Sequence, residues 1–291
     1  MNNNSIFNKK IHEPIPQYLY HYTSSKGLLG IIKEGEIWVT KIQYLNDSSE
    51  LNLAFTLIRN EIENQLERES IIRSRNELEE MKKRLDNINF SFNESDIGGI
   101  NLAVTSFSKN ANQLSQWRGY CKVGDGYALG LYGDKLKEEI QNTAYLLPCI
   151  YKEDEQKELV RELVNCCSLQ DPGEDRETEE MPQINEISFE KAVLLISPMI
   201  KDKGFEDEEE WRLIFKGGRT DPEFRSGNSS IIPYWKINLN LNKTLYQIVI
   251  GPTPLKDQSK NAVRTLLRKK TLFIIHRADG VINSDIPFGN V

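Results

Sequence analysis

The sequence predicts an α+β fold, built as one domain over residues 1–291, in which strands and helices do not alternate regularly. Short alternating apolar runs predict strands towards both ends of the chain, at 18–23 (YLYHYT) and 245–251 (LYQIVIG). Two charged stretches with narrow apolar stripes predict a helical insertion at about 48–95 that packs against the core. Because the last third is rich in strands, the pattern favours α+β over a doubly wound parallel sheet.

Composition and charge narrow the class of protein. The 291 residues are 38% hydrophobic, enough to bury a substantial core, and the net charge of -6 confines any nucleic-acid contact to a local surface. The four cysteines form no CxxC pair and share no zinc-like spacing with the three histidines, which predicts reduced thiols and no metal site. Since no apolar segment suits a signal peptide or a membrane span, we expect a soluble cytoplasmic protein.

The next elements follow from caps, turns and periodicity. Ser24 or Ser25 caps a helix that ends at Gly35, and a second short strand follows at 37–40. The later predicted elements are a strand ending at 105–108, a short helix (112–120), strands at 126–132 and 146–152, helices at 152–167 and 189–205 (bent at Pro198), strands at 211–216, 230–240 and 272–278, and a helix at 256–270. An acidic loop is expected at about 168–183, where charge and proline accumulate.

The segment FEDEEEWRLIF, at 205–215, places a run of acids directly before a strand. The strand period of two puts Glu208, Glu210 and Arg212 on one face, opposite Trp211 on the apolar face. When the apolar face packs into the core, Glu210 lies at the mouth of the strand close to Arg212, a setting that tunes a carboxylate without neutralising it. The alternative is a solvated acidic turn in which Arg212 pairs with a glutamate at the surface.

The first strand carries His21 and Thr23 on one face and Tyr20 and Tyr22 on the other. His21, Tyr22 and Thr23 can hydrogen-bond to a ribose or an amide, while the following helix offers backbone N–H groups to an anion. The alternative is a core histidine whose polar atoms are satisfied within the protein.

A second group of polar side chains lies between Thr105 and Tyr120. Ser106 and Ser108 end a strand, and Trp117 and Tyr120 follow on a short helix, so these side chains can line a ligand pocket. The alternative is that the hydroxyls cap the helix and Trp117 packs beneath it. The sequence contains no Walker-type phosphate loop, GxSxG elbow or HExxH motif, which leaves metal-free carboxylate chemistry.

The predicted helix at 256–270 is strongly basic, with six basic residues and one acid. Lys260, Arg264 and Arg268 are spaced by four and share one face. Such a stripe is consistent with a solvated helix surface. The sharper hypothesis is contact with the phosphates of a nucleic acid.

Several separated motifs, taken in order, resemble the bacterial family called domain of unknown function 2971. They are LYHYTS and the following segment to LNDSSE (19–50), VTSFSKNANQLSQWRGYCKVGDGYALGL (104–131), FEDEEEWRLIF (205–215), IVIGPTP (248–254) and NSDIPF (283–288). Each motif is loose alone, but together they are specific and extend over nearly the whole chain. The same order of parts more remotely resembles the ADP-ribosyltransferase superfamily, in its histidine-tyrosine-glutamate branch.

The superfamily resemblance implies a split antiparallel β-core that holds NAD as a substrate. It makes Glu210 the catalytic glutamate, with Glu208 and Glu209 beside it in sequence. It also implies that His21 holds a ribose hydroxyl and that Tyr120 or Tyr127 stacks on a ring. The NAD-binding residues implied in this way are His21, Tyr22, Thr23, Ser106, Ser108, Trp117, Tyr120 and Arg212, with no metal ligand.

The expected function is therefore an NAD-dependent ADP-ribosyltransferase or another NAD-consuming effector, such as a bacterial toxin or a phage-defence protein. A carboxylate against the ribose stabilises the oxocarbenium-like charge that develops when the nicotinamide–ribose bond breaks. The acceptor, whether protein, DNA, RNA or water, is left open, as is a regulatory partner. The alternatives are a non-catalytic ligand-sensing or protein-interaction module, and a nuclease or phosphotransferase that binds nucleic acid through the helix at 256–270.

Overall fold

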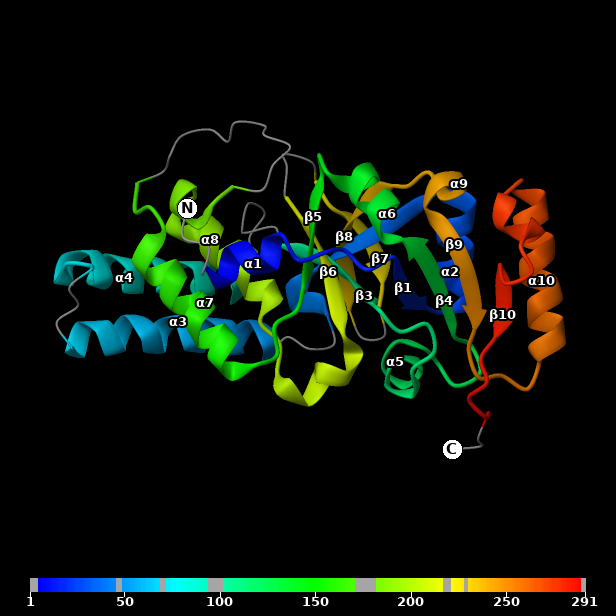
Figure 1. Ribbon diagram of the computed structural model, residues 1–291, viewed down its shortest axis with the longest axis horizontal. Coiled ribbons are helices and arrows are strands. Elements are labelled where there is room, and N and C mark those ends of the chain that lie inside the picture. The colour runs from blue at the N-terminus through cyan, green and yellow to red at the C-terminus, as the bar shows by residue number, and fades with distance from the viewer. Residues whose placement is uncertain are drawn as a thin grey trace.

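The computed structural model describes residues 5–45, 49–68, 72–93, 102–170, 182–216, 221–227 and 230–288. It shows an α+β structure around a ten-stranded, mostly antiparallel sheet (Figure 1). The strands are β1 (Tyr18–Thr23), β2 (Glu36–Lys41), β3 (Ala103–Ser108), β4 (Tyr127–Tyr132), β5 (Ala144–Pro148), β6 (Glu210–Phe215), β7 (Glu223–Ser226), β8 (Ile231–Asn238), β9 (Leu245–Ile250) and β10 (Val281–Asn283).

Helices surround this sheet. The α-helices are α1 (Ile6–Ile11), α2 (Ser25–Glu34), α3 (Ser49–Glu67), α4 (Arg75–Asn93), α5 (Leu114–Tyr120), α6 (Gly133–Ile140), α7 (Glu153–Cys166), α8 (Phe189–Ile196), α9 (Leu241–Thr244) and α10 (Lys256–Lys269). The 3₁₀ helices are η1 (Ile42–Tyr44), η2 (Ile184–Glu186), η3 (Ser197–Met199), η4 (Lys203–Glu208) and η5 (Phe273–His276). Among these described helices, none is both long enough and apolar enough to cross a lipid bilayer.

The sheet forks at β3. Its main path runs β10-β9-β4-β1-β3-β2-β8-β7, while β6 pairs with both β3 and β5. Since β6 lies along β3 from Val104 to Ser108, β1 and β2 share the opposite edge of β3. β1 meets that edge at Ser108 and β2 meets it at Ala103 and Val104, so the two strands separate over the middle of β3. Within the described residues, every strand pair except β9–β10 is antiparallel.

The two faces of the sheet carry different layers of helices, because side chains alternate along each strand. Val104 of β3 and Ile214 of β6 join a core formed with α1, α3, α4, α7 and α8. Phe107 and Leu213 point to the other side and join a core formed with α2, α6, α9 and α10. We call these sides the α3 face and the α10 face. In Figure 1 the α3, α4, α7 and α8 group lies at one end of the sheet and α10 at the other.

The helices predicted at about 48–95 are confirmed as α3 and α4 in the described residues. Ile58 and Ile62 of α3 and Leu85 of α4 are completely buried. They belong to the same apolar cluster as Val104 and Ile214 of the sheet, together with side chains of α7 and α8. The apolar stripes of the two helices therefore extend the core of the α3 face.

Three local predictions differ from the structure. The helix predicted at 189–205 ends at Ile196, where Pro198, which has no N–H to donate, enters the 3₁₀ helix η3. The strand predicted at 272–278 is wrong, because this segment forms η5. The prediction also missed β7 and β10, which are too short to show an alternating pattern. Of the predicted acidic loop at 168–183, residues 171–181 lie outside the described part of the chain.

Helix α2 ends as predicted and offers a matched test of its cap. Gly35 has a φ of 69°, which disfavours any residue with a Cβ, and a Cβ there would lie 3.3 Å from the Leu239 carbonyl oxygen. Gly30, inside the same helix, has open space where a Cβ would lie. We expect Gly35→Ala to lower the free energy of unfolding by about 1 kcal/mol and Gly30→Ala to raise it by about 0.5–1 kcal/mol. Urea denaturation measures both, and a neutral Gly35→Ala would contradict the cap.

Candidate functional site

Buried charged side chains meet at the start of β6, on the α3 face. Glu210 is the first residue of the strand, and Arg212 follows on the same face. Lys201, between η3 and η4, bonds to both Glu208 and Glu210. Lys201, Glu210 and Arg212 are each no more than 3% exposed. We call Lys201, Glu208, Glu210 and Arg212 the buried charge cluster.

Short hydrogen bonds connect the buried charge cluster. Arg212 Nε donates to Glu210 Oε1 at 2.7 Å, and Arg212 Nη1 donates to the Pro198 carbonyl oxygen at 2.9 Å. Lys201 Nζ donates to Glu208 Oε2 at 2.6 Å and also to Glu210 Oε2. The Glu210 carboxylate is therefore paired on both oxygens, by a cation on each side. Such compensation is what allows a carboxylate to lie away from water.

Neighbouring backbone fixes the position of Glu210. The register of β3 and β6 places Ser108 opposite Glu210 and Ser106 opposite Arg212. The Ser108 hydroxyl donates to the Glu208 carbonyl oxygen at 2.8 Å, and the Glu210 N–H donates to the Tyr151 hydroxyl at 2.8 Å. The end of β3 and Tyr151, three residues beyond the end of β5, therefore hold the first residue of β6 between them.

The three consecutive glutamates occupy three different environments. Glu210 is buried, whereas Glu208 is half-buried and ion-paired with Lys201. Glu209 has a φ of 43°, and its exposed carboxylate pairs with Lys109 at 3.1 Å. Because the chain turns at Glu209, adjacent carboxylates point to different surroundings. Of these three glutamates, Glu210 is the one enclosed by the protein.

The charges around Glu210 determine its ionisation. Burial alone would raise the pKa of Glu210, but the charges of Arg212 and Lys201 and their hydrogen bonds outweigh burial and lower this pKa to about 2. The carboxylate is therefore ionised at neutral pH. Burial raises the pKa of Tyr120 and of Tyr151, and the charge of Glu210 raises both further. Both tyrosines therefore stay protonated and can donate a hydrogen bond.

His21 and Thr23 lie on the α10 face, away from the buried charge cluster. Their strand positions alternate with that of Tyr22, which lies on the α3 face, and the His21 ring centre is 5.7 Å from that of Phe107. His21 Nδ1 lies 3.0 Å from the Ser106 carbonyl oxygen, at the part of β3 where β1 and β2 separate. A carbonyl oxygen only accepts, so Nδ1 carries the proton. Burial lowers the pKa of His21, which favours the neutral imidazole.

The other predicted binding residues gather around α5. Tyr22 and Trp117 pack edge to face, with ring centres 4.5 Å apart. The Tyr22 hydroxyl donates to the Asn110 carbonyl oxygen at 2.8 Å, and Trp117 Nε1 donates to Asn112 Oδ1 at 2.9 Å. These bonds within the protein hold α5 against the sheet. The same helix carries Tyr120, which is 40% exposed.

Tyr120 and Tyr127, the two candidates for a stacking ring, lie on different sides of the sheet. Tyr120 is close enough to Glu210 to feel its charge, so it belongs to the α3 face. Tyr127 packs against the core of the α10 face. Only the first of these two rings lies on the side of the buried charge cluster.

A cavity of about 200 Å³ borders Glu210. Lys109, Cys149, Tyr151 and Trp211 are among the residues that line it. Its volume is smaller than the roughly 300–1,000 Å³ of typical small-molecule pockets, so it suits a single ring and not a whole dinucleotide. In the part of the chain that the structure describes, no group of three or more histidine, cysteine, aspartate or glutamate side chains is placed to hold a metal ion.

Lys201 and Tyr151 are the residues of this site that the sequence analysis missed. Lys201 directly follows the apolar run AVLLISPMI (192–200), and Tyr151 directly follows LLPCI (146–150). A charged or phenolic residue directly after a buried run is a signal of burial with a partner, although it does not name the partner. Neither residue lies in a periodic element that would give its direction.

A family model described as a protein of unknown function (DUF2971) matches residues 116–213. The match supports the family resemblance over this part of the chain. It begins within α5, which carries Trp117 and Tyr120, and ends within β6, which carries Glu210 and Arg212. The matched region therefore includes every member of the buried charge cluster. No curated protein and no solved structure matches the chain significantly.

Removing one cation should show how much stability the buried charge cluster contributes. We expect Lys201→Met to lower the free energy of unfolding by about 3–5 kcal/mol, because it leaves Glu210 buried with one partner fewer. The matched control is Lys109→Met, which removes an exposed ion pair with Glu209 and should cost less than about 1 kcal/mol. Urea denaturation compares the two, and equal costs would refute the importance of burial here.

The lowered pKa of Glu210 predicts a stability that depends on pH. The ionised carboxylate stabilises the folded protein above its ordinary pKa of 4.5, and this contribution is lost as the pH falls through that value towards about 2. The difference in unfolding free energy between the wild type and Glu210→Gln should therefore shrink as the pH is lowered. Urea denaturation over this interval measures the difference. A difference that stays constant with pH would argue against a depressed pKa.

Proposed function

We propose that the protein is an NAD-cleaving enzyme, either an ADP-ribosyltransferase or an NAD glycohydrolase, in which Glu210 acts on the nicotinamide ribose. The observation that supports this proposal is an ionised carboxylate, fixed at the mouth of β6, beside a cavity that suits one ring. A fixed negative charge stabilises the oxocarbenium-like transition state, in which positive charge develops on the ribose. No metal is needed for this step.

In this proposal the surrounding residues have distinct roles. Arg212 and Lys201 keep Glu210 ionised and oriented, and Tyr151 lines the cavity that receives the ribose. Tyr120 offers the partly exposed ring on the same side of the sheet for stacking. His21 positions β3 through the Ser106 carbonyl oxygen and does not contact the substrate.

The acceptor of the ADP-ribose also belongs to the proposal. The basic stripe of α10 forms no ion pair among the described residues; its members are Lys260, Arg264 and Arg268. Like charges spaced by four repel one another on a helix. This stripe supports a phosphate-bearing acceptor such as DNA or RNA. The alternative acceptor is a protein, in a toxin or a phage-defence effector.

A second candidate function is a non-catalytic ligand-sensing or protein-interaction module. It is favoured by the same pairing of Glu210, since Arg212 and Lys201 occupy both oxygens of the carboxylate. A buried ion network of this kind also occurs in proteins where it only holds the fold. The two candidates differ in whether a substrate gains access to Glu210.

The test is to incubate the purified protein with NAD and to measure free nicotinamide. Glu210→Gln keeps the size of the side chain, removes its charge, and should reduce release by about a hundredfold or more. Glu79→Gln is the control, because Glu79 is an exposed glutamate of α4 that does not line the cavity beside Glu210, and it should retain wild-type release. Thermal melting confirms that both variants are folded.

The outcomes separate the two candidates. Release by the wild type that is lost in Glu210→Gln and kept in Glu79→Gln would support the enzyme. NAD binding without release, measured by calorimetry, would favour the sensing module. Release that persists in folded Glu210→Gln would show that this carboxylate is not the catalytic one.

A further inference from the structure

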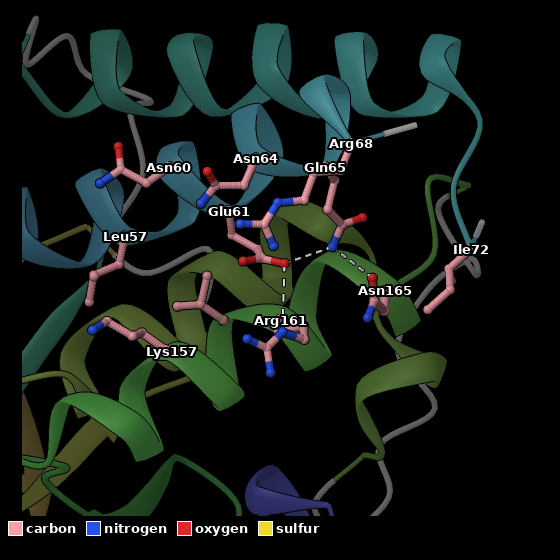
Figure 2. A pocket seen from close by; sticks show the side chains of 11 residues that line it. Leu57, Asn60, Glu61, Asn64, Gln65, Arg68, Ile72, Lys157, Arg161 and Asn165 are labelled. Atoms are coloured by element: carbon pink, nitrogen blue, oxygen red, sulfur yellow. Dashed lines mark hydrogen bonds and ion pairs between the residues drawn. The ribbon is translucent and has the colours of Figure 1, made fainter. Parts of the chain in front are cut away.

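A groove between α3 and α7 has the size of a ligand site (Figure 2). Its cavity measures about 560 Å³, within the range of roughly 300–1,000 Å³ that small-molecule sites occupy. It shares no lining residue with the cavity beside Glu210. The groove is therefore a separate feature of the helical layer, and the proposed NAD chemistry does not use it.

The floor of the groove is a polar network that joins the two helices. Gln65 Nε2 donates to Glu61 Oε1 at 2.8 Å and to Asn165 Oδ1 at 2.9 Å. Arg161 Nε lies 3.9 Å from the same Glu61 oxygen. Because Glu61 faces Arg161 and Gln65 faces Asn165, α3 and α7 run in the same direction here. Figure 2 shows the contacts of Gln65 with Asn165 and of Glu61 with Arg161 crossing from one helix to the other.

One side of the groove carries polar side chains that the fold does not use. Asn60 and Asn64 of α3 and Arg68, the residue directly after this helix, line the groove at spacings of four. Within the described residues, none of these three side chains has a hydrogen-bond or ion-pair partner. Asparagine is disfavoured inside helices, because its amide competes for backbone hydrogen bonds. Helix stability therefore does not explain two asparagines at this place.

The other side of the groove is basic. Lys157 and Arg161 line it from α7 and pair outwards with Glu153 at 3.3 Å and with Glu158 at 2.5 Å. These side chains are all about half exposed or more, and exposed pairs of this kind contribute about 1 kcal/mol or less. An anion that enters the groove can therefore replace the outer glutamates at little cost.

The groove combines charge with apolar surface. Its lining has three cations and one carboxylate, that of Glu61, in a protein whose net charge is -6. Leu57 adds apolar surface, and Ile72, at one end of the groove, is 64% exposed. An anion bound to a flat, partly apolar ring matches this lining.

We propose that the groove binds a nucleotide. Arg68, Lys157 and Arg161 bind the phosphates, which are anions that guanidinium and ammonium groups recognise. The amides of Asn60 and Asn64 each offer a donor and an acceptor, the pattern that pairs with the edge of a base. The apolar side chains pack against the base. This inference does not rest on the activity proposed for Glu210.

The test is isothermal titration calorimetry of the full chain with ATP and GTP, beside adenosine, guanosine and inorganic phosphate. We expect ATP or GTP to bind about tenfold or more tightly than its nucleoside or phosphate alone, because both parts of the site contribute. The double variant Asn60→Leu and Asn64→Leu, which removes the amides while keeping good helix formers, should weaken binding about tenfold or more. Arg161→Glu should do the same.

Two control variants change exposed residues of the same helical layer and leave the lining of the groove unchanged. Asn52→Leu changes an exposed asparagine of α3 outside the groove, and Arg75→Glu changes an exposed arginine of α4. Both should bind within about twofold of the wild type. Thermal melting checks the fold of each variant, and the asparagine variants carry the test if Arg161→Glu is unfolded.

Three results would overturn the proposal. The first is that the wild type binds neither ATP nor GTP. The second is that the folded groove variants bind as tightly as the wild type, which would place the site elsewhere. The third is that inorganic phosphate binds as tightly as the nucleotides, which would reduce the groove to an anion-binding surface. Nicotinamide release is measured separately, so either proposal can fail without the other.

Discussion

The ion pairing of Glu210 is the interaction on which the centre of the structure depends. A carboxylate that leaves water without a cation costs several kcal/mol, so β6 can begin inside the protein only because Arg212 and Lys201 are there. Arg212 comes from the strand itself, whereas Lys201 comes from the segment after η3. The charge of one residue therefore fixes how the helical layer of the α3 face joins the sheet.

The same ion pairing both favours and limits a catalytic role for the Glu210 carboxylate. Two cations hold the carboxylate ionised in one orientation, which is the preorganisation that electrostatic catalysis requires. They also neutralise much of its field, which limits what it can do for a positive charge on a substrate. The enzyme and the sensing module are thus two uses of one arrangement. They differ in whether a substrate reaches Glu210.

Much of this architecture could be read from the sequence, but the relations between strands could not. Alternation correctly placed Glu210 and Arg212 on one face, and caps correctly bounded α2. The face on which His21 lies depends on the strand register. Because Tyr20 pairs with Ser108, His21 lies on the other face of the sheet from Ser106 and Ser108. Lys201 lies outside regular structure, so no period gives its direction. The prediction of a strand at 272–278 was wrong, because a short apolar run does not by itself distinguish a strand from a helical turn.

The fork at β3 has a mechanical consequence. One arm of the sheet leaves β3 through β1, another through β2 and a third through β6, so a single strand joins all three. Over the gap between β1 and β2, the His21 ring donates a hydrogen bond to the Ser106 carbonyl oxygen. Among the described residues, β1 and β3 share a single registered residue pair, Tyr20 with Ser108, so the His21 ring and the common apolar core hold the two strands together along the rest of β3.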